Sequence, residues 1–167
     1  MQEWTVAGGL VEGPDGSLLL VRNRRRWGTH DWSPPGGVID ATDAGVVEGL
    51  TREVFEETGI SVSEWDGPVY EVSAKAFDFG WHLRAQIFVA RRYDGEIAVD
   101  DPDGIVVDAA FVAGTSCGEL LADCFPWVRE PLGEWIEHRW GADAPRAYHY
   151  EVYGTDPTSL RVERVEA

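Results

Sequence analysis

The chain has 167 residues, 44% of them hydrophobic, which suits one domain with a substantial core. No stretch approaches the roughly 20 apolar residues of a membrane-spanning helix, and the first residues have neither the basic nor the apolar part of a signal peptide, so we expect one cytoplasmic domain over residues 1–167 that makes no membrane contact. The formal net charge of −16 disfavours a nucleic-acid polymer as partner, because binding to its backbone depends on lysines and arginines.

The chain opens with two predicted strands. Residues 5–11 and 17–22 are rich in aliphatic side chains, and the Gly-Pro-Asp-Gly sequence at 13–16 favours a turn between them. We therefore expect these two strands to pair as a hairpin.

The segment before Gly59 is predicted to be a helix. Val47, Leu50 and Val54 recur at helical spacing, so this apolar stripe is expected to pack on a sheet. Thr42 or Asp43 can cap the start of the helix, and Gly59 suits the left-handed conformation that ends one.

Three glutamates lie close together on this predicted helix. Glu53, Glu56 and Glu57 stand at i, i+3 and i+4, so their side chains project from neighbouring turns. A solvated acidic face is the ordinary interpretation of such a cluster. Mg²⁺, however, requires oxygen ligands of this kind and shares its remaining positions with water and substrate phosphates. We therefore predict a Mg²⁺ site, in which Mn²⁺ can substitute, with Arg52 bracing Glu56 from four residues away.

The residues around the glutamates resemble the Nudix box. A Pro-Pro-Gly-Gly turn ends at Gly37, and residues 52–60 match the second half of the box in full. The first half differs, because Asp43 stands where the family has glutamate and eight residues instead of seven separate it from Arg52. A one-residue insertion in a loop is energetically mild. The role of Asp43 stays open.

The resemblance implies both a fold and an activity. The fold is an α/β/α sandwich with a mixed sheet, and the activity is metal-dependent hydrolysis of a nucleoside diphosphate linked to another moiety, such as a nucleoside triphosphate, a nucleotide sugar, ADP-ribose or a dinucleoside polyphosphate. The implied metal ligands are the Gly37 carbonyl and the carboxylates of Glu53, Glu56 and Glu57, and the implied catalytic residues are Glu53, Glu56 and Arg52.

The base that accepts a proton from water is not fixed by the sequence. It is Glu53 or a carboxylate outside the box, and the sequence does not choose among Asp101, Asp103 and Glu119. The small phosphorylated substrate itself also stays open.

Other functions of a Nudix-like fold are less well supported. A binding module that senses a nucleotide without cleaving it would be expected to lose some of the carboxylates in residues 52–60, and all are present. Isomerisation of an isoprenoid diphosphate needs a cysteine facing a small alkene, which Cys117 and Cys124, in a predicted helix after the box, match poorly.

A basic run between the second strand and the Gly-Gly turn is a candidate substrate contact. Residues 22–26 hold four arginines, of which Arg24 and Arg26 are expected to reach a phosphate near the metal. Trp32, close before the turn, is expected to stack on a nucleobase. A solvated loop and an ordinary core tryptophan are the alternatives.

The remaining chain predicts further strands and two helices. Ser116 with Glu119 has the spacing of a capping box for a helix that runs through Cys124, and Pro126 can open a second helix. Its inner stripe would be Val128, Leu132, Trp135 and Ile136. The expected strands are residues 69–76, 82–92 and 108–112.

A C-terminal hairpin extension is expected over residues 146–166. Alternating apolar and polar residues at 147–153 and 160–165 flank a turn-rich segment. An isolated two-stranded hairpin is marginal in water, so it must pack on its own domain or on a second copy of the chain. We favour contact in a homodimer.

Overall fold

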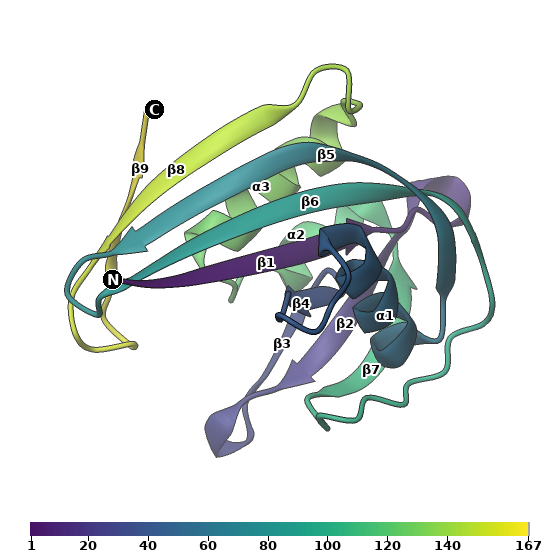
Figure 1. Ribbon diagram of the computed structural model, residues 1–167, viewed down its shortest axis with the longest axis horizontal. Helices are drawn as coiled ribbons and strands as arrows, with labels where there is room; N and C mark the ends of the chain where they lie inside the picture. The colour runs from purple at the N-terminus through teal and green to yellow at the C-terminus, as the bar shows by residue number, and fades with distance from the viewer. Residues whose placement is uncertain (167) are drawn as a thin grey trace.

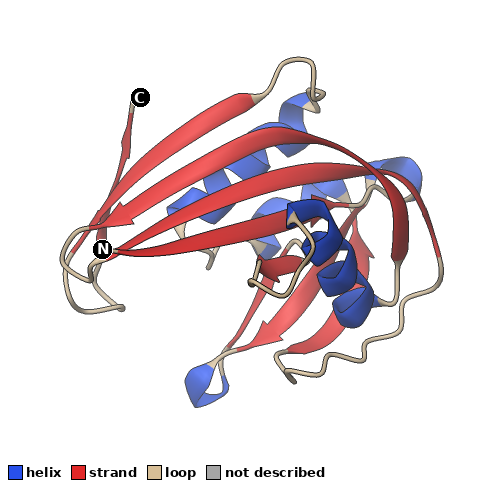
Figure 2. Cartoon of the chain, viewed as in Figure 1, coloured by secondary structure: helices blue, strands red, loops and turns tan. Residues whose placement is uncertain are grey.

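The protein forms two sheets with helices on both faces of the larger one, as seen in a computed structural model that describes residues 1–166 (Figure 1, Figure 2). The larger sheet has the order β4 (Gly36–Val38), β1 (Gln2–Leu10), β6 (Trp81–Asp94), β5 (Ser61–Ala76), β8 (Arg146–Tyr153) and β9 (Arg161–Val165). The smaller sheet contains β3 (His30–Ser33), β2 (Leu18–Arg24) and β7 (Val106–Val112). The helices are α1 (Val46–Thr58), α2 (Gly114–Leu120) and α3 (Pro126–His138), with short 3₁₀ turns at Pro14–Gly16 and Arg26–Gly28.

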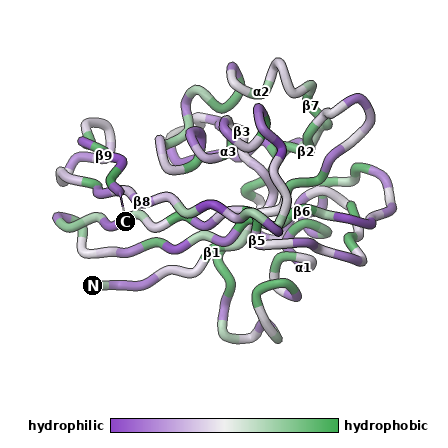
Figure 3. Tube along the Cα trace, turned by 90° about the horizontal axis from the view of Figure 1, so that it is seen from above, coloured by the Kyte–Doolittle hydropathy of each residue, from purple (hydrophilic) through white to green (hydrophobic). Residues whose placement is uncertain are grey.

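The large sheet is mixed. Strands β1 and β6 pair in parallel, as do β5 and β8, whereas β5 with β6, β1 with β4, and β8 with β9 are antiparallel. Helix α1 lies on one face, and α2, α3 and the small sheet lie toward the other (Figure 3). This arrangement confirms the expected α/β sandwich with a mixed sheet.

Strand β2 connects the two hydrophobic clusters of the core. Leu18 and Leu20 belong to the cluster under α3, while Leu19 and Val21 belong to the cluster under α1, and all four side chains are fully buried. Because side chains alternate along a strand, a strand that is apolar at every position buries both of its faces. The Leu-Leu-Leu-Val sequence at 18–21 thus specifies an interior strand.

Helix α1 packs as expected, except at its start. Leu50 and Val54 are fully buried, but Val47 is 36% exposed, and Val46 packs against the core in its place. The predicted cap at residues 42–43 is wrong: the helix starts after Gly45. Gly59 ends it in the left-handed conformation, with φ of 80°, as predicted.

The predicted first hairpin is wrong. The chain does turn at residues 13–16, and Glu12 bridges to Leu18, but β1, which ends before the turn, belongs to the large sheet, and β2, which follows the turn, belongs to the small one. Each strand finds longer pairing elsewhere, β1 with β6 over nine residues and β2 with β7 and β3. Strand β5 also starts earlier than expected, at Ser61, through an irregular, bulged segment.

The two predicted helices near the C-terminus differ in outcome. Helix α3 opens at Pro126 and buries Leu132 and Trp135 as expected, together with Trp127. The capping box of α2 is wrong, because that helix already starts at Gly114 and ends at Leu120, so Ser116 lies inside its first turn. Cys124 therefore follows the helix.

The C-terminal hairpin packs on its own chain. Strand β8 pairs in parallel with β5 over seven residues, from Tyr70 opposite Arg146 to Ala76 opposite Val152, and β9 adds the edge strand. The hairpin thus extends the large sheet of its own chain, which is one of the two alternatives expected from the sequence, and a homodimer stays a prediction. Among the described residues, the helices include none that is long and apolar enough to cross a membrane.

Candidate active site

Helix α1 places two of its glutamates against the Gly-Gly strand β4. Glu57 is 6% exposed, and its Oε2 accepts a hydrogen bond from the Gly36 N–H at 3.1 Å. A Cβ added to Gly37 would lie 3.3 Å from Glu53 Cδ and 3.4 Å from Glu53 Oε2, so the Gly37 backbone and that carboxylate are neighbours. Glu53, Glu57 and Gly37, which are distant in the sequence, therefore lie in one place.

Gly36 is required by the close approach of β4 to β1. Its φ is +148°, and an added Cβ would lie 2.1 Å from the carbonyl oxygen of Ala7. The strands pair there, with Gly36 opposite Gly8 and Gly37 opposite Ala7. A larger residue would push β4 away from the sheet and move the Gly37 backbone away from Glu53.

The Arg52 side chain forms ion pairs with three carboxylates, those of Asp43, Glu53 and Glu56. Its Nε and Nη2 donate to the two carboxylate oxygens of Asp43 at 3.0 and 3.1 Å, and its Nη1 donates to Glu56 Oε2 at 3.2 Å. Nη2 also lies 3.3 Å from Glu53 Oε1. Arg52 thus holds three carboxylates at once, including the expected contact to Glu56, and the guanidinium of Arg52 lowers the pKa of Asp43.

The structure gives Asp43, whose role the sequence left open, a structural role as the ion-pair partner of Arg52. Because both of its oxygens accept hydrogen bonds from Arg52, and Oδ2 also accepts one from the Asp40 N–H at 3.1 Å, Asp43 connects the loop before α1 to the middle of that helix.

Burial disfavours the ionised form of two of these glutamates, Glu53 and Glu57, in the metal-free protein. Burial raises the pKa of Glu57 to about 8, opposed by the Gly36 N–H and reinforced by the charges of Glu53 and Asp101. Burial also raises the pKa of Glu53, although Arg52 counteracts it. A cation placed among these groups would remove part of that penalty.

The acidic loop between β6 and β7 adds negative charge to the same place. The Asp101 side chain accepts hydrogen bonds from the N–H groups of Ile105 and Val106, at 2.9 Å each, and so fixes the loop. The charge of Asp101 acts on Glu57 and that of Asp103 acts on Glu53. Helix α2, which contains Glu119, lies on the other side of the large sheet from α1 (Figure 1, Figure 3).

The donor set matches a hard divalent cation. Carboxylates and a backbone carbonyl are the ligands that Mg²⁺ and Mn²⁺ prefer, and thiol and imidazole groups are not part of this set. Within residues 1–166, no group of three His, Cys, Asp or Glu side chains already has the arrangement of a finished metal site. Since Arg52 holds Glu53 and Glu56, these carboxylates would have to turn from the guanidinium to bind an ion.

A cavity of about 230 Å³ opens beside the Gly-Gly strand, between the large sheet and α3. Tyr70 and Trp127 supply aromatic surface in its lining, and Arg25 supplies a cation. Arg25 Nε and Nη2 donate to the Asp31 carboxylate at 2.7 and 3.0 Å, which orients the guanidinium. A planar apolar group bearing an anionic extension fits this chemistry.

The three predicted substrate contacts, Arg24, Arg26 and Trp32, are not among the residues that line this cavity. Arg24 donates to the Gly104 carbonyl oxygen at 3.2 Å, and Arg26 is exposed in a 3₁₀ turn. Trp32 packs against the cluster under α3, and its carbonyl oxygen accepts the Cys124 thiol at 2.9 Å. The sequence thus located the basic run but missed Arg25, the arginine in the cavity lining.

Comparison with known proteins places the fold. The NUDIX domain family matches residues 3–120. No curated protein sequence matches the chain. Solved structures with this fold include a Mutator MutT protein from Bacillus halodurans (23% identity, 96% of this chain and 97% of that chain covered, TM-score 0.63) and a MutT NUDIX hydrolase from Burkholderia pseudomallei (26%, 69% and 86%, 0.58). An ADP-ribose pyrophosphatase from Streptococcus suis is also similar (19%, 90% and 98%, 0.56).

Because the NUDIX domain family matches most of this chain, the chain belongs to the Nudix family. It is a Nudix hydrolase, an enzyme that acts on diphosphate bonds.

Proposed function

We propose that the protein is a cytoplasmic, Mg²⁺- or Mn²⁺-dependent pyrophosphohydrolase that cleaves a nucleoside diphosphate linked to another moiety. The observation that carries the proposal is the meeting of Glu53 and Glu57 with the Gly36-Gly37 backbone, beside a cavity that contains an arginine and two aromatic residues. Glu53, Glu56, Glu57 and the Gly37 carbonyl would hold the metal ion. When bound, such an ion neutralises phosphoryl oxygens and lowers the pKa of water.

Other steps of the proposed reaction are assigned to side chains of the protein. Glu53, next to the Gly37 backbone, accepts the proton of the attacking water, a step worth about 10² to 10⁴ in rate. Arg52 orients Glu53 and Glu56 through its ion pairs. Asp103 is the distal carboxylate that we favour as an alternative base, because Asp101 is engaged by backbone N–H groups.

The cavity beside the Gly-Gly strand is proposed to hold the nucleoside. Its Trp127 and Tyr70 surfaces would contact the base, and Arg25, held by Asp31, would contact a phosphate at the mouth. This proposal replaces Arg24, Arg26 and Trp32 as the expected substrate contacts.

Replacing Arg25 with alanine is expected to raise KM about tenfold and leave kcat within about threefold, because one charge-assisted hydrogen bond contributes about 1.5 to 3 kcal/mol to binding. Steady-state kinetics on the best substrate measure both constants. Arg26→Ala is the matched control, since it removes the same charge from an exposed neighbour outside the cavity lining, and should change KM by less than about twofold. Equal effects of the two variants would place the phosphate elsewhere.

The first test of the proposed function is a hydrolysis panel with Mg²⁺ or Mn²⁺. It should cover nucleoside triphosphates, oxidised dGTP, ADP-ribose, NADH, nucleotide sugars and diadenosine polyphosphates. We expect turnover of one class, lost in EDTA, with Glu56→Gln lower by about 10²-fold or more and still folded. Normal turnover of Glu56→Gln would move the site away from α1. Binding that raises the melting temperature without turnover of any compound would instead support the non-catalytic module.

A further inference from the structure

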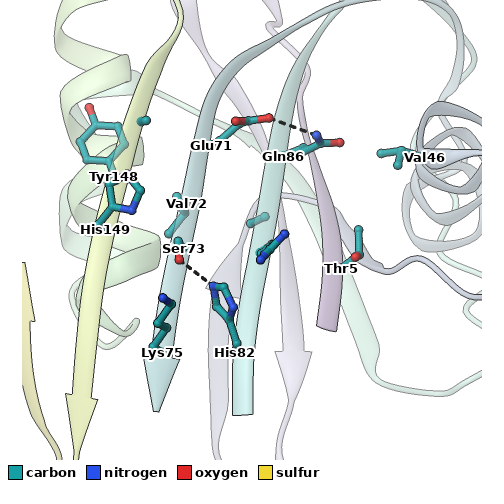
Figure 4. A pocket seen from close by; sticks show the side chains of 13 residues that line it. Thr5, Val46, Glu71, Val72, Ser73, Lys75, His82, Gln86, Tyr148 and His149 are labelled. Atoms are coloured by element: carbon teal, nitrogen blue, oxygen red, sulfur yellow. Dashed lines mark hydrogen bonds between the residues drawn. The ribbon is translucent and has the colours of Figure 1, made fainter. Parts of the chain in front are cut away.

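Helix α1 leaves part of its sheet face uncovered. Figure 3 shows α1 beneath one end of the large sheet only. Toward the other end of that face lies a cavity of about 590 Å³, shown in Figure 4, built by β1, β6, β5 and β8 and reaching Val46 at the start of α1. Its polar lining includes Glu71, Ser73, Lys75, His82, Arg84 and His149.

Three residues in and beside this cavity form a chain of two polar contacts, a hydrogen bond between Ser73 and His82 and a close contact between His82 and the Glu3 carboxylate. Ser73 Oγ lies 2.7 Å from His82 Nε2, and His82 Nδ1 lies 3.2 Å from Glu3 Oε2. The residues come from β5, β6 and β1, and strand pairing brings them together, since Glu3 is opposite His82 and Ser73 is opposite Arg84. His82 is 5% exposed, whereas Ser73 is half-buried and lines the cavity.

The negative charge of Glu3 and the Ser73–His82 hydrogen bond together give the chain a direction. An ionised Glu3 carboxylate attracts an N–H group and repels a ring lone pair, so the tautomer of His82 with its proton on Nδ1, 3.2 Å from Glu3 Oε2, is the favoured one. In the neutral imidazole, Nε2 is then the acceptor, and the Ser73 hydroxyl must be the donor. Ser73 thus points its proton at a base that is itself oriented by a carboxylate. This is the arrangement of an activated nucleophile.

We propose that Ser73, His82 and Glu3 form a second, metal-independent site that hydrolyses small polar carboxylic esters. Ser73 Oγ attacks the ester carbonyl carbon while His82 Nε2 takes the hydroxyl proton, and the carbon–oxygen bond to the leaving alcohol breaks as that alcohol receives the proton. Water then attacks the Ser73 acyl group by the same proton path. The acid is released and the Ser73 hydroxyl is regenerated.

Lys75 supplies the positive charge that the developing oxyanion needs. The backbone N–H groups along β5 are engaged in pairing with β6 and β8, so a side chain must do this work. Lys75 is two residues from Ser73 on the same face of β5 and extends along the strand toward it (Figure 4). The polar and open lining favours a small polar acyl group.

The test uses the full chain in EDTA, so that metal-dependent hydrolysis is silent. A fluorophosphonate probe followed by peptide mass spectrometry should modify Ser73, and p-nitrophenyl acetate should give a burst of p-nitrophenol. We expect Ser73→Ala to abolish both signals, and His82→Gln to lower the labelling rate by about 10²-fold or more. Ser63→Ala removes another serine of β5, whose hydroxyl donates only to the Arg92 carbonyl oxygen in the described chain, and should change nothing.

Glu3 is a positioning residue, and its side chain is 58% exposed, so its variants should fold even if those of His82 do not. We expect Glu3→Gln to slow labelling about tenfold at an unchanged melting temperature, and Glu3→Asp to restore part of the rate. Diphosphate hydrolysis by Ser73→Ala should equal that of the unmodified chain, because the inference does not rest on the proposed function. A folded protein whose Ser73 stays unlabelled, or labelling unaffected by Glu3→Gln and His82→Gln, would overturn the inference.

Discussion

Replacing Glu57 with glutamine is expected to abolish metal-dependent hydrolysis and also to stabilise the metal-free protein at alkaline pH. Activity should fall by about 10²- to 10³-fold, because a proposed metal ligand is lost. The free energy of unfolding should rise because Glu57 is buried and its pKa is raised to about 8. Keeping this carboxylate ionised at alkaline pH therefore costs the folded state free energy. Glutamine keeps an oxygen that can accept the Gly36 N–H without that charge.

The sign of the pH dependence follows from the direction of the pKa shift. The carboxyl group is protonated more readily in the folded chain than in the unfolded one, so the stability that protonation gives is present below pH 4.5 and is lost as the pH rises toward about 8. The difference between the variant and the unmodified protein should therefore grow from pH 5 to pH 8.5 and then level off. We expect a gain on the order of 2 kcal/mol, or about 4 to 8 °C in melting temperature.

Thermal denaturation in EDTA at several pH values measures this effect. Glu48→Gln is the matched control, since Glu48 lies exposed in the first turn of the same helix and should show neither the pH-dependent gain nor the loss of activity. Saturating Mg²⁺ should stabilise the unmodified chain by about 3 kcal/mol at 100 times the Kd and Glu57→Gln by much less. A variant that is less stable than the unmodified chain at every pH would contradict the assigned burial penalty.

Replacing Arg52 with methionine is expected to weaken both the fold and the catalysis. The variant leaves Asp43, Glu53 and Glu56 without the guanidinium that they share. Because the Arg52 side chain is 39% exposed, solvent screens part of this repulsion, and we expect a loss of about 1 to 3 kcal/mol in the metal-free protein. The value of kcat/KM should fall by about 10- to 100-fold, since the carboxylates lose their orientation.

Two comparisons separate charge from geometry at this position. Arg52→Lys keeps the charge but not the paired hydrogen bonds to Asp43, so it should recover stability more than activity. Mg²⁺ should offset part of the stability lost in Arg52→Met, because the ion supplies positive charge in the same place. If Arg52→Met melts at the same temperature as the unmodified chain in EDTA, the ion pairs contribute nothing to stability.

Features specified by neighbouring residues could be predicted from the sequence. The spacing of residues 52–60 predicted the helix, its Arg52–Glu56 contact and the left-handed end at Gly59, and all three are present. The predicted cap at residues 42–43 was wrong because the Asp43 carboxylate accepts hydrogen bonds from the side chain of Arg52, which lies further along the helix, instead of from the first backbone N–H groups of the helix. Local propensity contains no information about such a tertiary partner.

Features that depend on strand pairing could not be predicted. Arg25 follows the end of β2, where the alternation of side chains stops, so periodicity could not select it over Arg24 or Arg26. His82 was expected to be an ordinary polar residue, because its partners Ser73 and Glu3 are 9 and 79 residues away in the sequence. Only the order β1-β6-β5 in the sheet brings them together.

Strand β2 has a consequence for how the molecule opens. Its alternate side chains enter both hydrophobic clusters, so neither cluster can lose its packing while the other keeps a complete set of contacts. The two halves of the interior are thus one cooperative unit, and the amides of β2 should exchange with solvent only through global unfolding. Motions that admit a substrate must then come from the loops around the sheets, while the interior keeps the proposed metal-binding helix and the uncovered sheet face in a fixed relation.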